Sequence, residues 1–133
     1  MTGTRIPPPL AARLRPAFGA HVERARLHCG RVARVLTSAA GVGAIVFGRR
    51  VFLGTEAERE VSAEGPAAAE LLAHELVHVR QYRRLGTAAF LGHYVGEYLR
   101  GRLAGASHAE AYRAISFERE AEEEATGFRN EPG

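Results

Sequence analysis

The segment LLAHELVHVRQ, residues 71–81, contains two histidines four positions apart, and this spacing constrains the fold more than any other feature of the chain. A proline at position 66 and a glycine at position 86 bound the segment, which predicts a helix over residues 66–84. Because residues i and i+4 lie on the same face of a helix, both imidazoles point toward one position in space. Buried imidazoles without partners are costly, so the fold has to bring partners to them. The apolar stripe of the predicted helix consists of Leu72, Leu76 and Val79.

The order His-Glu-x-x-His is the spacing with which one helix supplies two ligands to a tetrahedral zinc ion. Glu75 lies about 100° round the helix from His74, so it can reach a water on the metal without binding the metal itself. Zinc lowers the pKa of such a water to about 7, and a nearby carboxylate can then accept its proton. The motif therefore predicts one Zn²⁺ per chain, with His74 and His78 as ligands and Glu75 as general base. Two histidines on an ordinary helix are the alternative.

A catalytic zinc usually has three protein ligands and one open position. A third histidine six residues after His78, as in metzincins, is absent because that position is Arg84, and the chain contains no aspartate. A glutamate from a later helix is therefore expected. Glu118 and Glu122 lie four apart, with Glu118 on the apolar side of its helix, which predicts Glu118 as third ligand and Glu122 as hydrogen-bond acceptor for a ligating imidazole. The other candidates for the third ligand are Glu120, Glu97 and His93.

Peptide hydrolysis also needs a donor that stabilises the tetrahedral intermediate. The candidates are Tyr94, Tyr98, Tyr112 and His93. Each of them has a core or surface role as the commoner alternative.

The first half of the chain predicts short helices and a hairpin. Residues 8–17 predict a helix, residues 22–30 a strand that ends at Gly30, and residues 31–41 a short helix of ambiguous pattern. Two β-branched and aromatic runs flank Gly48-Arg49, which predicts a hairpin over residues 44–54. Residues 1–7 are expected to be a loose lead, and the polar residues 55–65 a surface connection.

The second half predicts two further helices. Thr87 can cap a helix that runs to about residue 101. Ser107 with Glu110 three positions later forms a capping box, which predicts a helix from His108 to Thr126, ended by Gly127. Residues 127–133 are expected to fray. The residues expected to face inward from the first of these helices are Phe90, Leu91, Tyr94, Tyr98 and Leu99.

Length and composition fit one α+β domain over residues 1–133, because 46% hydrophobic residues can supply a core. The net charge of +3 comes from scattered arginines, so nucleic-acid binding is not expected. The chain has no Sec signal peptide and no apolar run of membrane-spanning length, which predicts synthesis in the cytoplasm and leaves export by another route open. Cys29, the lone cysteine, is expected to be a small buried residue. His21 and His108 are expected at the surface, and His28 has no assigned role.

Three segments together resemble the extracellular contractile injection system core domain family: LAARLRPAFGAHVERARLHCG, GAIVFGRRVFLG and LLAHELVHVRQYRRLG. The resemblance covers roughly residues 6 to 86. It implies a metallopeptidase site with His74 and His78 as metal ligands and Glu75 as the catalytic residue.

Residues 90–125 resemble the extension of longer, gluzincin-like members, in which Glu-x-x-Ala-Asp is the corresponding pattern. Glu118 to Glu122 is similar to it, with glutamate in place of the aspartate, and this implies Glu118 as third ligand. In gluzincins a sheet edge beside the motif helix binds the extended substrate backbone. Residues 49–54 are the expected edge, with a plain core strand as the alternative.

The chain is thus expected to be a minimal zincin-like domain, mostly helical, with a small sheet packed on the motif helix. The expected function is hydrolysis of peptide bonds in a peptide or protein substrate by zinc-activated water. The alternative is a non-catalytic zinc-binding structural or interaction domain that associates with injection-system components. Glu75 favours catalysis, because a purely structural site has no use for it.

Overall fold

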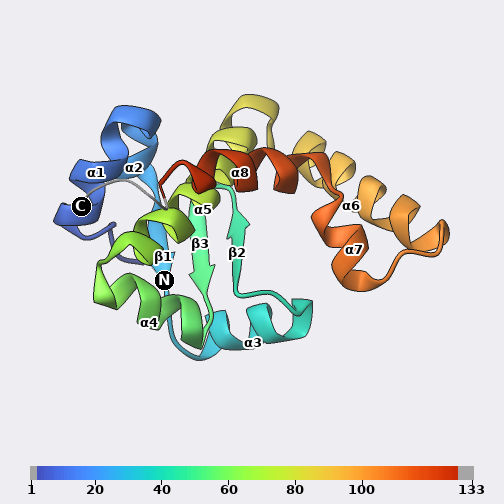
Figure 1. Cartoon of the computed structure of the whole chain (residues 1–133), viewed down its shortest axis with the longest axis horizontal. Helices are drawn as coiled ribbons and strands as arrows, with labels where there is room; N and C mark the ends of the chain where they lie inside the picture. The colour runs from blue at the N-terminus through green and yellow to red at the C-terminus, as the bar shows by residue number, and fades with distance from the viewer. Residues whose placement is uncertain (1–2, 129–133) are drawn as a thin grey trace.

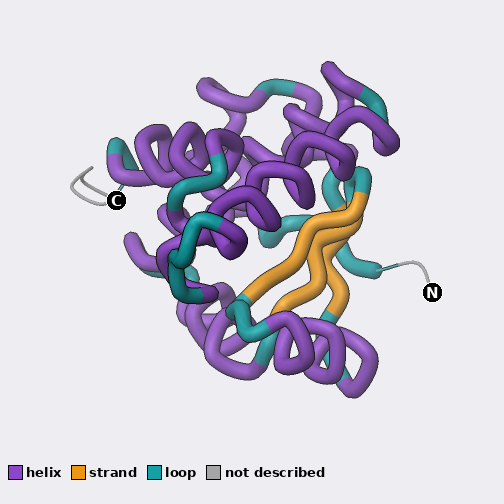
Figure 2. The backbone as a smooth tube through the Cα atoms, turned by 90° about the vertical axis from the view of Figure 1, so that its right-hand side faces the viewer, coloured by secondary structure: helices purple, strands orange, loops and turns teal. Residues whose placement is uncertain are grey.

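The computed structural model describes residues 3–128, and it confirms a mostly helical α+β fold with one small sheet (Figure 1). The sheet consists of β1 (Arg26–His28), β2 (Ala44–Phe47) and β3 (Arg50–Leu53) in the order β1-β3-β2. β3 pairs parallel to β1 and antiparallel to β2, and the three strands run side by side along the helical layer (Figure 2).

The predicted hairpin is confirmed as β2 and β3, joined by Gly48-Arg49. Gly48 has a φ of 65°, whereas Arg49 has no positive φ. This is the pattern of a type II′ turn, whose twist suits a tight hairpin. Of the two interpretations of residues 49–54, a sheet edge and a core strand, the structure shows the core strand, because β3 has a paired strand on both sides. The edge strand of the hairpin is β2.

The N-terminal segments differ in part from the predicted ones. α1 (Pro8–Phe18) and α3 (Arg31–Ala40) confirm the predicted helices. The predicted strand over residues 22–30 is shorter, because its beginning belongs to α2 (Ala20–Arg24). Its weak alternation contained both the end of a short helix, with Val22 buried, and a strand of three residues.

The described part of the lead, residues 3–7, is not loose. The main-chain atoms of Thr4 and Leu27 exchange two hydrogen bonds of 2.8 and 2.7 Å, and Ile6 is buried in the core. A backbone partner and one apolar side chain are enough to hold the segment beside β1.

Residues 55–63 form a helix, α4 (Thr55–Ala63), where a surface connection was predicted. Its buried residues, Ala57 and Val61, lie four apart on one face. Two small apolar residues among charged ones give a weak pattern, which is why the sequence did not predict this helix.

The motif helix is α5 (Pro66–Leu85), followed by α6 (Thr87–Leu103). Both agree with the predicted helices, and Gly86, with a φ of 87°, separates them. Thr87 makes no side-chain capping hydrogen bond and is the first residue of α6. Leu99 is 52% exposed, so its predicted inward orientation is wrong, whereas Phe90 is buried as expected.

The predicted helix from His108 to Thr126 is two helices, α7 (His108–Arg113) and α8 (Ser116–Thr126). The capping box of Ser107 and Glu110 is confirmed at the start of α7. The break falls before Ser116, whose main-chain nitrogen and hydroxyl both donate to the carboxylate of Glu97 on α6. The break turns α8 so that it packs along α5.

α5 is the central element of the fold and packs against α1, α4, α6, α8 and β2 (Figure 1). Leu72, Leu76 and Val79 are buried, as predicted. At the end of α8, Phe128 is buried and its ring stacks on Phe18 of α1, so the described start of the predicted fraying tail is packed. Residues 129–133 lie outside the described residues. Between residues 3 and 128 no helix has the length and apolar character to cross a membrane.

Candidate metal centre

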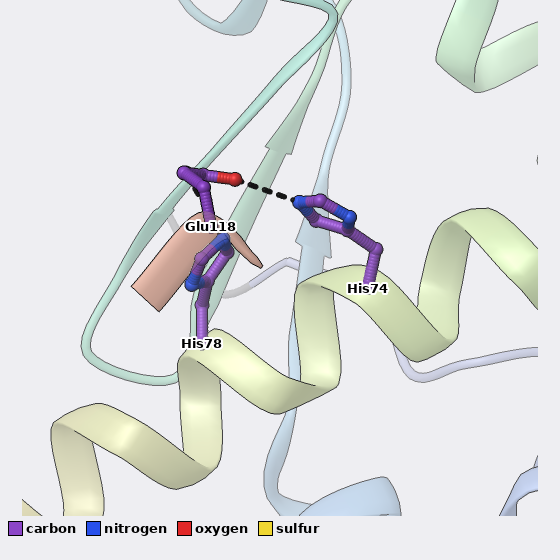
Figure 3. A group of neighbouring side chains, drawn as sticks. All are labelled: His74, His78 and Glu118. Carbon is purple, nitrogen blue, oxygen red and sulfur yellow. Dashed lines mark hydrogen bonds and ion pairs between the residues drawn. The ribbon is translucent and has the colours of Figure 1, made fainter. Parts of the chain in front are cut away.

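Three side chains from two helices meet at one position (Figure 3). His74 and His78 extend from successive turns of α5, and Glu118 extends toward them from α8. Glu118 Oε1 lies 2.9 Å from His74 Nε2, and Oε2 lies 3.1 Å from His78 Nε2. One ligand atom from each of these residues lies within 4.8 Å of the other two, so they can hold a metal ion. We call His74, His78 and Glu118 the ligand group.

The group is buried and strongly coupled. His78 and Glu118 are each 5% exposed, and His74 is half-buried. Burial lowers the pKa of each histidine, but the carboxylate of Glu118 outweighs burial and raises the pKa above 6.5. Burial raises the pKa of Glu118, but the close approach of both imidazoles outweighs burial and holds that pKa well below the ordinary value. The Glu118 carboxylate therefore favours a positive charge at the position where α5 and α8 meet.

The second nitrogen of His78 is fixed by a fully buried glutamine. His78 Nδ1 lies 2.8 Å from Gln81 Oε1, while Gln81 Nε2 donates to the Phe117 carbonyl and to Glu120 Oε1. Because the amide nitrogen faces two oxygen acceptors, the amide oxygen faces the imidazole, and His78 Nδ1 is the donor. This partner leaves His78 Nε2 as the nitrogen that points into the site.

The outer nitrogen of His74 faces the residue predicted for it. His74 Nδ1 lies 3.6 Å from Glu122 Oε2, within ion-pair distance but longer than a good hydrogen bond. The Glu122 side chain is 64% exposed and lies one turn beyond Glu118 on α8. Carboxylate or amide partners on the outer nitrogens are the usual arrangement of metal-binding histidines.

The surroundings of His78 Nε2, the nitrogen that points into the site, indicate whether a metal ion fits there. This buried atom makes no hydrogen bond within residues 3–128, although it lies 3.1 Å from a carboxylate oxygen. With the proton on Nδ1, a neutral imidazole presents a lone pair to that oxygen, and two acceptors at this distance need a cation between them. A second proton or a metal ion can supply it. Two imidazoles and a carboxylate are a donor set that zinc binds, and the residues present therefore fit the metal.

Glu75 is buried beside the three candidate ligands. It is 8% exposed, and burial together with the Glu118 carboxylate raises its pKa, against the opposing effect of the two histidines. It also lines the cleft on the His74 side of the site. This position suits a residue that accepts a proton beside a bound metal and does not itself bind the metal.

The four donor candidates lie in different places. Tyr94 donates its hydroxyl proton to Glu118 Oε2 at 2.5 Å and so holds a candidate ligand. Tyr98 shares a 2.8 Å hydrogen bond with His108 Nδ1. His93 is exposed, and its ring lies edge-on to Phe117.

Tyr112 lines the same cleft as Glu75, the predicted general base. It lines the clefts on both sides of the ligand group. Burial, and then the carboxylates of Glu118 and Glu75, raise its pKa, so its hydroxyl keeps its proton.

The other candidates for third ligand have different partners. Glu97 binds Ser116, and Glu120 accepts from Gln81 at 2.6 Å. Glu124 forms an ion pair with Arg80 of α5. These contacts fasten α8 to α5 and α6 and so position Glu118.

Two residues near the site were not predicted to act there. Gln81 supports His78, and the only signal in the sequence is its place three residues after that histidine, on the same helix face. Tyr82 is buried and donates to the Val46 carbonyl of β2 at 3.0 Å, which joins the motif helix to the edge strand.

The remaining histidines and the cysteine lie away from the ligand group. His28 is buried and stacks on Phe52 of β3, and His21 is half-buried rather than at the surface. His108 is exposed, as predicted. Cys29 is exposed, so its predicted burial is wrong, because it follows β1 directly and faces outward.

Comparison with protein-family models matches residues 5–86 to the eCIS core domain. This range includes the sheet and α5 with both histidines, and it ends where α5 ends. Glu118 and the helices α6 to α8 lie beyond it. Searches of curated proteins and of solved structures gave no match.

Proposed function

The chain belongs to the eCIS core domain family, which connects it with contractile injection systems, and we propose that it is a zinc-dependent peptidase of that setting. The observation that carries this proposal is the convergence of His74, His78 and Glu118, with Glu75 buried beside them. Its partners are then a peptide or protein substrate and components of an injection system.

In this proposal His74, His78 and Glu118 hold the metal, as expected for a zincin-like domain. A bound zinc ion supplies a Lewis acid that polarises the scissile carbonyl and makes water acidic. Glu75 takes the water proton on its carboxylate and passes it to the leaving nitrogen. The Tyr112 hydroxyl keeps its proton and can donate to the carbonyl oxygen as charge develops there.

The edge strand β2 supports binding of an extended substrate. Its residues line the cleft next to His78 and Glu118, and its other side is paired with β3. An exposed sheet edge binds an extended chain through main-chain hydrogen bonds. The Val46 carbonyl already accepts from Tyr82, so a substrate pairs with the rest of the strand.

Hydrolysis of a peptide library by the zinc-loaded chain, analysed by mass spectrometry, tests the proposal. Glu75→Gln should keep the zinc and lose hydrolysis by at least about a hundredfold, the scale of general acid–base catalysis. Glu123→Gln, an exposed glutamate of α8, is the matched control and should keep both. Zinc binding without hydrolysis in the wild type would instead favour the non-catalytic zinc-binding domain, and retained hydrolysis in Glu75→Gln would refute the role of Glu75.

A further inference from the structure

A cavity of 320 Å³ opens directly from the ligand group, between β2, α6 and α7. His78 and Glu118 line its inner end, and Ile45, Leu91 and Val95 line its walls. We infer that this cavity binds a large apolar side chain of the substrate, aromatic or branched aliphatic, next to the bond to be cut. The inference rests on the proposed function and adds the substrate class to it.

The size of the cavity matches such a side chain. A cavity of about 150 Å³ already holds a benzene molecule, so the present volume accommodates a phenyl or isobutyl group with its Cβ. A glycine or alanine would leave most of the apolar surface unfilled. Burial of apolar surface favours binding by roughly 25 cal/mol per Å², so larger apolar side chains gain the most.

The mouth of the cavity exposes apolar side chains to water. Phe47 at the end of β2 is 51% exposed, and Val95 on α6 is 48% exposed. Both line the cavity, and they face it from a strand and a helix on opposite sides. An apolar rim that continues into an apolar cavity gives an entering side chain contacts from the mouth to the ligand group.

The cleft on the other side of the ligand group is more acidic. It is lined by His74 and Glu75 and by acidic side chains on α4, α5 and α8. These acidic residues are Glu56, Glu60, Glu70 and Glu122. The two clefts share Ala44 of β2, so an extended substrate along that strand passes from one to the other. The first cavity therefore suits an apolar side chain, because a charged side chain buried there without a partner would be costly.

Binding of short alanine-rich peptides to the zinc-loaded Glu75→Gln chain tests the inference without cleavage. The peptides carry one central Phe, Leu, Asp or Lys, and fluorescence anisotropy gives the dissociation constants. The Phe and Leu peptides should bind at least about tenfold more tightly than the Asp and Lys peptides. Hydrolysis of the same peptides by the wild type should follow the same order.

A variant at the cavity mouth and a control on the same helix locate the effect. Val95→Glu places a carboxylate at the mouth and should remove the preference for Phe and Leu. Leu103→Glu changes a residue that is 89% exposed, on α6 but outside the cavity lining, and should leave the preference unchanged. Circular dichroism checks that both variants fold, and the peptide comparison in the parent chain does not depend on either of them.

The outcomes separate the two proposals. Equal binding of all four peptides would overturn the inference, and so would hydrolysis that does not distinguish them, although that result would support the peptidase. Preferential binding of Phe and Leu without hydrolysis by the wild type would support the apolar cavity and refute the peptidase.

Discussion

Replacing Gln81 by Met tests how the site is supported, because the variant keeps the length of the side chain and removes its amide. Gln81 is fully buried and makes three hydrogen bonds, to His78, to the Phe117 carbonyl and to Glu120. Glu120 is half-buried and can turn to water, and the Phe117 carbonyl keeps its main-chain partner within α8, whereas His78 Nδ1 is left without a partner. A buried unpaired polar group costs about 1–3 kcal/mol, so the variant should lower the free energy of unfolding by about that amount.

The same change should weaken zinc binding. Loss of the partner of a ligating imidazole typically costs about 10- to 100-fold in metal affinity. Without the amide oxygen of Gln81, His78 can rotate or protonate the nitrogen that faces Glu118. We expect zinc affinity to fall by this factor in Gln81→Met.

Two measurements check this prediction. Urea unfolding of the chelator-treated protein gives the change in stability, and competition with a coloured chelator gives the zinc affinity. Arg83→Met, an exposed position two residues further along α5, is the control and should change neither by much. Unchanged zinc affinity in a folded Gln81→Met variant would refute the reasoning that the amide holds His78.

Two further predictions concern the tyrosines around the site. Tyr94→Phe removes the hydroxyl that donates to Glu118 and should weaken zinc binding about tenfold in the same competition assay, and an unchanged affinity would mean that Glu118 needs no such support. Burial raises the pKa of Tyr82 to about 12, whereas an unfolded chain ionises tyrosine near pH 10. The contribution of Tyr82 to stability is therefore complete below pH 10 and is lost as the pH rises through 12. Tyr82→Phe should lower the free energy of unfolding by about 1 kcal/mol at neutral pH. The free energy of unfolding of the variant should decline less between pH 10 and 12 than that of the wild type. Parallel pH curves for the two proteins would contradict the assignment.

The helices whose ends are marked by proline or glycine could be predicted from the sequence. α5 lies between Pro66 and Gly86, and its apolar residues recur at helical spacing, so its limits were within one residue. The hairpin followed from Gly48 between two β-branched runs. α4 was missed because its buried face consists of only two small residues. The other residues of this segment are mostly polar, and helix propensity alone is too weak a signal to distinguish such a segment from a surface connection.

Tertiary contacts decided what the sequence could not. The break before α8 depends on Glu97, nineteen residues earlier, which binds the first residue of that helix. The sheet order depends on the parallel pairing of β1 with β3, which placed the central strand where an edge was expected. Neither contact leaves a local pattern in the sequence.

The candidate site was predictable where chemistry and spacing coincide. His74, His78 and Glu75 follow from one helix, and Glu118 from its place on the apolar side of a later helix together with the lack of aspartate. The role of Gln81 was not predicted, because a buried glutamine that links two helices resembles any polar residue in the sequence. The ranking of the tyrosines needed the structure, since the packing of α6 against α8 brings Tyr94 to Glu118.

The content of zinc in the purified chain, measured by mass spectrometry beside a Glu118→Ala variant, tests the metal centre most directly. Glu123→Ala, an exposed residue of the same helix, serves as the control for loss of a glutamate. We predict about one zinc per chain in the wild type and in the control, and a lost or greatly weakened zinc in Glu118→Ala. A wild type that takes up no zinc even when zinc is offered would contradict the metal centre and leave the two histidines as protonated partners of Glu118.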